Sequence, residues 1–584
     1  MIGSSAVLLA LLASADAFYT VKRQVAREFL FQGIPPSREI RWYPCNETQE
    51  VYMECARLDV PLDYKNTSNN LRAIIPIVKF PTNATGEDYK GAVLTNPGGP
   101  GYLGTEFVYN PTIAKGIVAN VTGTGYDILG FDIRGVGYSI PYGACNVTAE
   151  DVFDPLRQNA TRDGYRNTKR NAGGYAKHGG GPPGALDTET AYGFYIPQVA
   201  ESALTQILDY AQNIDTLCQA YVGAENQAGP YMNTAVTATD MLSIAKALAR
   251  SRGDNSTNPL VHFYGVSYGT VLGQTFATMY PKNVGKFVLD GVVDMDGWQA
   301  RTETNTNRNA DEGLFQFFKR CYEAGPEECA FANGTCNYQD VINRFNRMTL
   351  RFNGTQYQGE ERIYAELLNT LASGLKSVLL NGLYSAIHTW KNTGIILTAL
   401  DVATSGPIVL WNATAIAEIL AYPLTDRSDR SERPVAPLQH RPYSFYQVAC
   451  GDALSIYNAT ISSAEQQLYL GSSVVGGDGR LGDRYVCTRF STRPKWEWHE
   501  RIGGATKTPI LFVGNTLDPV TPWDDAVKAS VKFKGAGVVI VDAIAHAFFD
   551  QENNCVQTKV RDYFQNGTMP GNDYKCAEER RPFT

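Results

Sequence analysis

Runs of apolar residues along the first third of the chain indicate a β-rich beginning. After residue 41 they are ECARLDVPLDY (54–64), LRAIIPIVKF (71–80), GAVLT (91–95) and YDILGF (126–131). A fifth run, LVHFY (260–264), predicts a short buried strand, and the apolar spacing of the following TVLGQTFATMY (270–280) predicts a helix. Helical patterns also cover residues 195–221 and 235–252. Strands and helices therefore alternate around the middle of the chain.

The pattern changes after the apolar strand of NVGKFVLDGVVD (283–294). Residues 298–494 predict helices and loops, and alternation resumes only in the last ninety residues. There we expect a strand at PILFVGN (509–515), a helix at 524–533, a strand at GVVIVD (537–542) and a helix at 555–564. Alternation predicts a mostly parallel sheet with helices on both faces. The helical block is then a cap over the carboxyl ends of the strands, where such sheets bind ligands.

These changes divide the chain into five segments. Residues 1–17 read as a secretory signal peptide, because the apolar stretch 6–13 precedes the small-residue pattern Ala15-Asp16-Ala17; a buried first helix is the alternative. A lead-in (18–40) follows, whose Lys22-Arg23 pair is either a processing site or plain surface. The first part of the core (41–297), the cap (298–494) and the C-terminal part of the core (495–584) complete the chain. A polar, glycine-rich insertion between 154 and 191 interrupts the first part.

The composition limits the kinds of binding partner that we expect for this protein. The 584 residues are 43% hydrophobic and 19% charged, with a formal net charge of −7 and scattered basic residues, so nothing indicates nucleic-acid binding. No second uncharged stretch is long enough to cross a membrane. Recurring Asn-x-Ser/Thr acceptors favour N-linked glycans on an exported protein. They lie at Asn46, Asn66, Asn83, Asn120, Asn146, Asn159, Asn255, Asn333, Asn353, Asn412, Asn458 and Asn566.

The cysteines support an oxidising compartment. None forms a C-x-x-C pair with metal-site spacing, so disulfides are the better interpretation. The pairs expected are Cys45–Cys55, Cys321–Cys329, Cys555–Cys576, Cys145–Cys218 and Cys450–Cys487. Because the count is eleven, one thiol stays unpaired, and we assign that thiol to Cys336.

The candidate chemistry starts at Gly265-Val266-Ser267-Tyr268-Gly269, between a strand and a helix. A G-x-S-x-G match alone is common, but a strand before it and a helix after it are the context that a nucleophile elbow requires. In such a turn the serine takes a strained backbone conformation, and the glycines avoid clashes with neighbouring elements. Ser267 is therefore the candidate nucleophile.

Partners for the serine come later in the chain, in the order serine, acid, histidine. Asp518 is the first acid after the strand 509–515, ahead of Asp524, Asp525 and Asp542. Of six histidines, only His546 follows the final strand. His546 would accept the proton of Ser267, and Asp518 would hold the imidazole tautomer.

A developing oxyanion needs two N–H donors. We expect one from the backbone of Tyr268 and the other from the glycine loop 96–101, at Gly99; a merely tight turn is the alternative for that loop. No cluster has metal-ligand spacing, and no G-x-G-x-x-G follows the first strand, so we expect no metal and no cofactor. The segment DIRGVGYS (132–139) is interpreted as a structural turn beside the glycine loop.

Several motifs in order resemble the secreted tripeptidyl aminopeptidase-like α/β-hydrolases, which are related to proline iminopeptidases. They are IRWYPC…ECARLDVPLDY, NPGGPG, DIRGVGYS, GVSYGTVLG, VLDGVVD, FVGNTLDPVTP and QNGTMPGNDYKC. The resemblance implies an α/β-hydrolase fold with a large helical cap before the last strands, a TAP-like C-terminal region, and a triad matching Ser267, Asp518 and His546. One departure is that Ala545 and Ala547 flank the histidine, where the family usually has glycines.

The resemblance also implies the reaction: a secreted serine exopeptidase that releases short peptides, tripeptidyl or prolyl in type, from free amino termini through an acyl-enzyme. A buried acid must then pair with the substrate ammonium, and Asp452 is the candidate; the alternative is a structural acid beside a disulfide. Two other functions stay open. The first is a carboxylesterase with the same triad, and the second is a catalytically idle binding protein, which predicts a missing triad member.

Overall fold

A computed structural model describes residues 30–45, 51–143 (without 67 and 69), 192–197, 212–354 (without 214, 217, 220 and 255), 362–424 and 441–583 (without 455, 550 and 573). Within these ranges one sheet runs through the molecule. Its strands lie in the order β1 (Tyr43–Pro44), β2 (Glu54–Pro61), β3 (Arg72–Phe80), β5 (Tyr126–Phe131), β4 (Gly91–Asn96), β6 (Val261–Val266), β7 (Val284–Asp290), β8 (Leu511–Asn515), β9 (Gly537–Val541) and β10 (Lys575–Cys576).

The sheet is mostly parallel, as predicted. β4 pairs parallel with β5 and β6, and the parallel pairing continues from β6 through β10. β1, β2, β3 and β5 pair antiparallel at the other end. The residues of β8 are all buried, and β7 exposes only Lys286 in part, which explains their nearly continuous apolar sequences. The predicted fold class is therefore confirmed.

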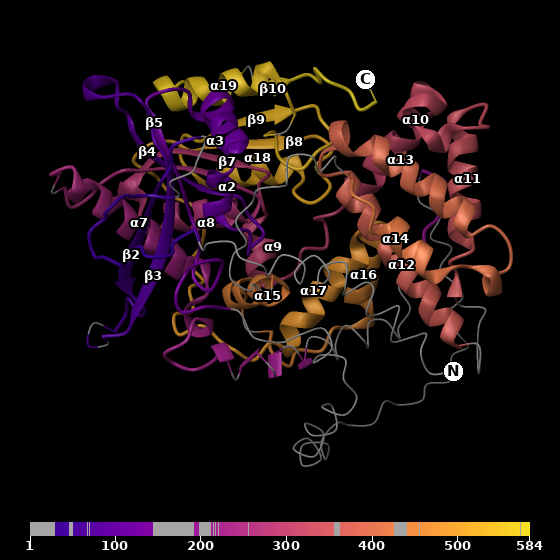
Figure 1. The fold of residues 1–584 in the computed structure, drawn as a ribbon, viewed down its shortest axis with the longest axis horizontal. Coiled ribbons are helices and arrows are strands. Elements are labelled where there is room, and N and C mark those ends of the chain that lie inside the picture. The colour runs from indigo at the N-terminus through magenta and orange to yellow at the C-terminus, as the bar shows by residue number, and fades with distance from the viewer. Residues whose placement is uncertain are drawn as a thin grey trace, which may run out of the picture.

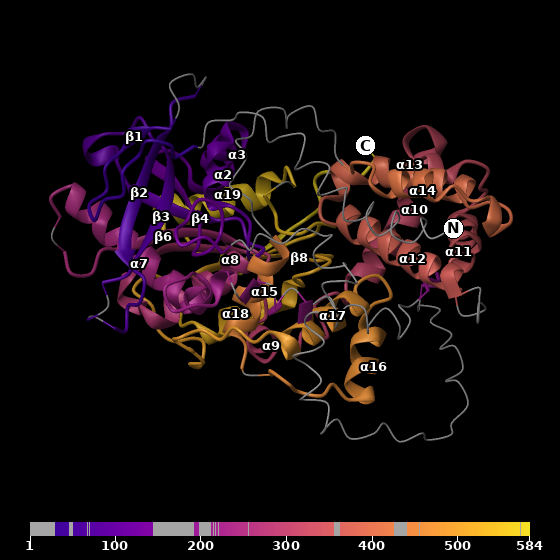
Figure 2. The same cartoon turned by 60° about the horizontal axis from the view of Figure 1, so that its bottom comes forward.

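Helices cover both faces of the sheet. α2 (Gly104–Tyr109), α3 (Pro111–Ile117) and α19 (Asn554–Asn566) lie on one face, and α7 (Thr234–Ser251), α8 (Tyr268–Met279) and α18 (Trp523–Lys532) lie on the other (Figures 1 and 2). The sequence predicted α7, α18 and α19 within a few residues. Among the described helices, none combines the length and the apolar character that crossing a bilayer demands.

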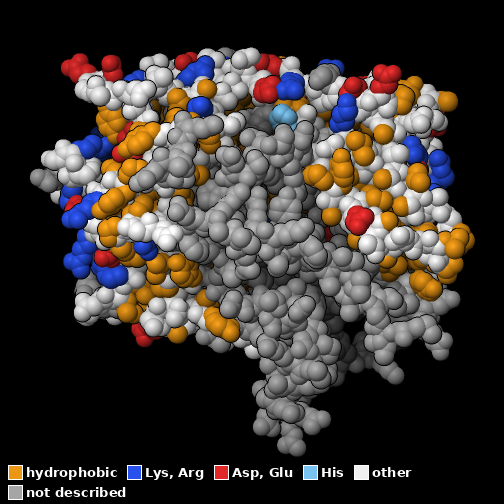
Figure 3. Space-filling view, viewed as in Figure 1, with side chains coloured by type: hydrophobic (Ala, Val, Ile, Leu, Met, Phe, Trp, Pro, Cys, Tyr) orange, Lys and Arg blue, Asp and Glu red, His pale blue; other side chains and the backbone are white. Residues whose placement is uncertain are grey.

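A helical region stands between β7 and β8 in the chain, beginning after α9 (Met295–Ala300). It contains α10 (Ala310–Glu328), α11 (Tyr338–Leu350), α12 (Arg362–Gly382), α13 (Ala386–Ala403), α14 (Ala413–Leu420), α15 (Arg441–Asp452), α16 (Ser463–Ser472) and α17 (Gly477–Arg489). Figure 1 shows α10–α14 beside the sheet domain, and these helices have their own core around Phe317, Phe345 and Trp390. Hydrophobic side chains also form patches on the surface of this region (Figure 3).

Some predicted features lie partly or wholly outside the residues that the structure describes. Most of the helix expected at 195–221, the signal peptide at 1–17 and the insertion at 154–191 lie outside the described residues. β1 and β10 were not predicted, because two-residue strands carry no periodicity. The boundaries proposed for the five segments stay predictions.

The disulfides agree with the pairing expected from the sequence. Cys45–Cys55, Cys321–Cys329, Cys450–Cys487 and Cys555–Cys576 are bonded. Cys218 is also disulfide-bonded, and Cys145, its predicted partner, lies outside the described residues. Cys336 is a free, exposed thiol.

The segment DIRGVGYS makes buried structural contacts after β5. The Asp132 carboxylate accepts hydrogen bonds from the backbone N–H groups of Thr105 and Tyr138. The Arg134 guanidinium donates twice to Asp240 on α7, at 2.8 Å each, and so ties this turn to the helix beneath. Removing one partner of such a buried pair leaves an uncompensated charge, which is why both residues matter to the fold.

His262, on β6, gives the fold a testable response to acid. Its Nδ1 accepts the backbone N–H of Lys286 at 2.9 Å, and burial lowers its pKa from 6.5 to about 4. The folded state therefore binds this proton more weakly than the unfolded state does. The stabilisation is complete above pH 6.5 and is lost as the pH falls through 6.5 toward 4, by on the order of 3 kcal/mol.

We therefore expect His262→Asn to flatten the dependence of unfolding free energy on pH between about 4 and 6.5. The Oδ1 of asparagine takes the place of Nδ1 as acceptor for the Lys286 N–H, but asparagine does not titrate. Urea unfolding at a series of pH values measures the slope for both proteins. Equal slopes would mean that His262 contributes nothing to the pH dependence.

Candidate active site

Ser267 lies at a sharp turn between β6 and α8. Its backbone φ of 56° and ψ of −120° are unusual for a residue with a side chain, and the residue is half-buried. The flanking glycines fit the predicted elbow. A Cβ on Gly265 would lie 2.5 Å from the carbonyl oxygen of Gly269, and one on Gly269 would lie 2.7 Å from that of Asn96. The strain is held in place by close packing, as at other functional turns.

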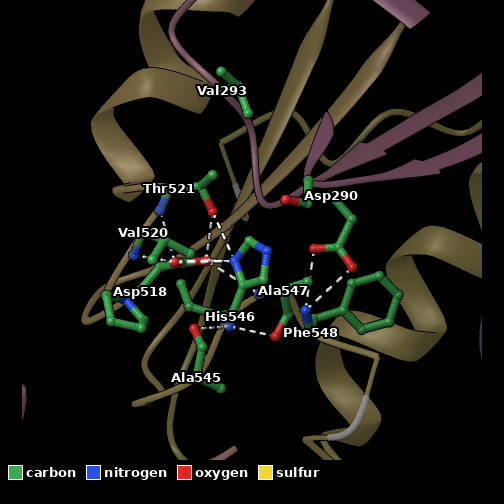
Figure 4. Close-up of polar contacts among 12 residues, drawn as sticks. Asp290, Val293, Asp518, Val520, Thr521, Ala545, His546, Ala547 and Phe548 are labelled. Carbon is green, nitrogen blue, oxygen red and sulfur yellow. Dashed lines mark hydrogen bonds and ion pairs between the residues drawn. The ribbon is translucent and has the colours of Figure 1, made fainter. Parts of the chain in front are cut away.

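Asp518 and His546 meet at the carboxyl ends of β8 and β9. Nδ1 of His546 lies 3.0 Å from Oδ2 and 3.1 Å from Oδ1 of Asp518 (Figure 4). The Asp518 side chain is fully buried, and that of His546 is 9% exposed. The carboxylate therefore fixes which ring nitrogen faces it and leaves Nε2 for other chemistry.

Backbone and hydroxyl donors surround the Asp518 carboxylate. It accepts the N–H groups of Val520 at 3.0 Å, Thr521 at 2.8 Å and Ala547 at 3.1 Å. The Thr521 hydroxyl donates to Oδ2 at 2.7 Å and lies 3.0 Å from Nδ1 of His546. Together these donors hold the Asp518 carboxylate in one orientation beside the imidazole of His546.

Thr521 is a site residue that the sequence analysis missed. Its position three residues after an aspartate in a turn is the available signal, because aspartate side chains commonly accept N–H groups two and three residues on. We expect Thr521→Val to lower kcat about tenfold with little change in KM, since a hydrogen bond to a charged group contributes about 1.5–3 kcal/mol. Steady-state kinetics on a chromogenic substrate that the wild type hydrolyses measures the change. Thr521→Ser should restore most of kcat, and an unchanged kcat in the valine variant would show the hydroxyl to be idle.

Ser267 and His546 both lie at the carboxyl end of β7. The Ser267 N–H donates to the carbonyl oxygen of Asp290 at 2.9 Å. A Cβ on the next residue, Gly291, would lie 3.2 Å from Cε1 of His546. Among the described residues no hydrogen bond joins the Ser267 hydroxyl to the imidazole. Such contacts are often long in substrate-free sites and tighten in the complex.

The glycine loop after β4 packs against Ser267. A Cβ on Gly98 would lie 2.8 Å from Cβ of Ser267 and 3.3 Å from the Tyr268 nitrogen. The Gly98 N–H is occupied, because it donates to Oδ1 of Asn96 at 2.9 Å. Gly99 is the next donor along the loop, and Tyr268 begins α8, where N–H groups lack helical partners. This arrangement suits the two predicted oxyanion donors, whose role stays a prediction.

Asp452 lies behind the elbow at the end of α15. Oδ1 accepts the Thr234 N–H at 2.7 Å, and Oδ2 accepts the Thr234 hydroxyl at 2.5 Å and the indole N–H of Trp298 at 3.0 Å. The same hydroxyl lies 2.8 Å from the Tyr268 hydroxyl. Burial raises the pKa of Asp452 to about 6. Asp452, Thr234 and Trp298 together line a narrow cavity.

The helical region contacts His546 directly. The His546 N–H donates to the Tyr384 carbonyl at 2.9 Å, and the two rings meet edge to face with centroids 5.0 Å apart. Ser385 forms a β-bridge with Ala545, and the Ala386 N–H donates to the Ile544 carbonyl. The loop between α12 and α13 therefore holds the loop that carries His546.

Among the described residues, no three His, Cys, Asp or Glu side chains are arranged to hold a metal ion. A serine at an elbow, a histidine beside a buried carboxylate and a glycine loop together suit acyl transfer.

Comparison with known proteins agrees with this fold. Residues 91–358 match the family model described as alpha/beta hydrolase fold, and residues 473–576 match the model described as TAP-like protein. The chain therefore has the α/β-hydrolase fold, and its C-terminal part is TAP-like. It is a serine hydrolase similar to the TAP-like proteins, as its motifs led us to expect.

Relatives match along nearly the whole chain at low identity. The serine protease Hip1 of Mycobacterium tuberculosis is 23% identical, over 92% of this chain and 91% of its own length. The tripeptidyl aminopeptidase of Streptomyces lividans is 22% identical, over 91% and 84%. Carboxylesterase B of M. tuberculosis is 25% identical, over 92% and 89%. A solved proline iminopeptidase from Mycobacterium smegmatis matches with a TM-score of 0.31 and 10% identity, over 87% and 97%.

Proposed function

We propose that this protein is a secreted serine exopeptidase that releases short peptides, of tripeptidyl or prolyl type, from the free amino termini of peptide substrates. The observation that carries the proposal is the Asp518–His546 pair beside the strained Ser267 elbow. The Streptomyces tripeptidyl aminopeptidase and the mycobacterial serine protease, both similar over more than 90% of this chain, support a peptide substrate.

The reaction starts with attack of Ser267 Oγ on the carbonyl carbon of the scissile bond. Nε2 of His546 takes the hydroxyl proton, and the Asp518 carboxylate stabilises the resulting imidazolium. The carbonyl oxygen gains the negative charge, and the N–H groups of Gly99 and Tyr268 donate to it. The imidazolium then gives its proton to the leaving amine, so that the C–N bond breaks and an ester to Ser267 remains. Water, deprotonated by His546, hydrolyses that ester and frees the released peptide.

Asp452 is our candidate for the residue that binds the substrate's amino group. Its carboxylate accepts three hydrogen bonds, and a carboxylate offers about four acceptor positions, so one position suits an ammonium. A short path of hydrogen bonds leads from Asp452 through the Thr234 hydroxyl to the side-chain hydroxyl of Tyr268, whose backbone N–H is one proposed oxyanion donor.

Export of the protein is part of the proposal. Four disulfides among the described residues suit an oxidising compartment, and the apolar residues 6–13 followed by Ala15-Asp16-Ala17 suit a cleaved signal peptide. We propose N-linked glycans on several of the Asn-x-Ser/Thr acceptors. Neither a nucleic acid nor a membrane is proposed as a partner.

A carboxylesterase is the second candidate, because the relative named carboxylesterase B is 25% identical over 92% of this chain. Esters and amides are cleaved by the same groups, so the site alone does not separate these activities.

Substrates and labelling test both candidates. We expect unblocked tripeptide arylamides to be hydrolysed, and acetylation of the peptide amine to stop turnover. If only p-nitrophenyl esters are cleaved and blocking the amine has no effect, the esterase replaces the peptidase. A fluorophosphonate should label the wild-type protein at Ser267 and should not label Ser267→Ala. An unlabelled wild type would favour the catalytically idle binding protein.

A further inference from the structure

Asp290, the last residue of β7, lies between the nucleophile and the base. The sequence analysis gave Asp290 no role. Its side chain is fully buried. Among the described residues, its contacts reach β6, which leads into Ser267. They also reach the loop that carries His546, as Figure 4 shows.

On the serine side, Asp290 holds the elbow in two ways. Its carbonyl oxygen accepts the Ser267 N–H at 2.9 Å. Its Oδ2 accepts the hydroxyl of Tyr264 at 3.0 Å, and Tyr264 is buried on β6 three residues before the nucleophile. The residue therefore touches both the nucleophile's backbone and the strand that ends in it.

On the histidine side, Asp290 holds the loop after β9. The Phe548 N–H, two residues beyond His546, donates to Oδ1 at 3.1 Å and to Oδ2 at 3.2 Å. Between these two residues stands Ala547, whose φ of 65° turns the chain sharply. Gly291, adjacent to Asp290, packs beside the imidazole at Cε1. The Asp290 carboxylate thus fixes the backbone of the loop that carries the His546 imidazole.

We infer that Asp290 is a positioning residue of the reaction, which sets the distance and orientation between Ser267 Oγ and Nε2 of His546. The inference rests on the proposed function, since it assigns Asp290 a part in that triad. Proton transfer depends on this alignment, and a misplacement of about 1 Å costs roughly a hundredfold in rate.

The cost of burying Asp290 supports a positional role. Burial raises its pKa to about 7, while the Phe548 N–H and the Tyr264 hydroxyl act against that rise. Apolar residues fill the strand interior around it, and one of them would be cheaper to bury than a carboxyl group. The presence of a carboxyl group at this position is explained by the contacts that join Asp290 to the Ser267 turn and to the His546 loop.

Fluorophosphonate labelling of the full chain tests the inference. The end point counts reactive serines, and the rate per reactive serine reports the alignment of Ser267 with His546, even in a partly folded sample. We expect Asp290→Ala to slow labelling and to lower kcat by about tenfold to a hundredfold, with KM changed less than threefold. Asp290→Asn keeps an oxygen acceptor for the Phe548 N–H and should retain labelling and kcat within about fivefold.

Asp215 supplies a matched control, because it is also a buried acid. Its carboxylate likewise accepts a backbone N–H at 3.1 Å and a hydroxyl at 2.6 Å, both from Ser491. Asp215→Ala should cost stability without changing the labelling rate per site. Wild-type labelling speed in Asp290→Ala, or an equal loss in Asp290→Asn and Asp290→Ala, would overturn the inference. Failure of the wild type to label at all would instead refute the proposed function.

Discussion

His546→Ala is expected to lower kcat by about 10⁶-fold, to the level left by binding and by the oxyanion donors alone. In characterised serine peptidases, removal of the histidine costs about as much as removal of the whole triad. The structural reason here is that, among the described residues, no second histidine lies at the elbow that could accept the proton of Ser267. Steady-state hydrolysis of a tripeptide arylamide and the rate of fluorophosphonate labelling measure the loss.

His388→Ala is the matched control, because His388 is exposed on α13 and the proposed mechanism gives it no role. It should keep wild-type kcat and labelling. A fall of less than a hundredfold in His546→Ala would show that another group serves as the base, and the assignment of His546 would be wrong.

Asp518→Asn is expected to lower kcat by about 10⁴-fold while the fold is kept. The asparagine amide is nearly the size of the carboxyl, but its N–H₂ group favours the wrong imidazole tautomer and removes the charge that stabilises the imidazolium. The four donors around Asp518 then face a neutral group. Kinetics together with thermal unfolding separates the chemical effect from a loss of stability.

Asp525→Asn controls for the loss of a buried acid nearby. Asp525, on α18, is 5% exposed and pairs with Lys528 at 2.7 Å. We expect this variant to keep kcat within about threefold. Equal activity losses in Asp518→Asn and Asp525→Asn would point to a general disturbance of this loop, not to a role in the reaction.

The fold was largely predictable because its signals are local. The apolar strands of the core are long enough to be recognised from their sequence pattern. The order of the elbow, the late strand and the last strand identified Ser267, Asp518 and His546 as candidates. The glycines at 265 and 269 stand where the backbones of neighbouring elements leave no room for a Cβ, so sequence spacing carried that information directly.

The supporting residues could not be predicted, because their contacts join distant parts of the chain. The Tyr384 carbonyl meets the His546 N–H across 162 positions in sequence, and Asp290 meets Phe548 across 258. Asn515 donates to the carbonyls of Ala545 and Ala547 through a side chain whose direction depends on the register of β8 against β9. Such pairings follow from how the sheet and the helical region assemble, and no local sequence pattern predicts them.

The bridge between the loop 383–386 and the histidine loop 544–546 ties activity to the integrity of the helical region. Ile544 belongs to the core of α10–α14, whereas Ser267 belongs to the sheet domain. Warming that loosens the helical core first would separate His546 from Ser267 while the sheet stayed intact. Inactivation would then precede global melting, and the enzyme's working range would be set by the less robust of its two halves.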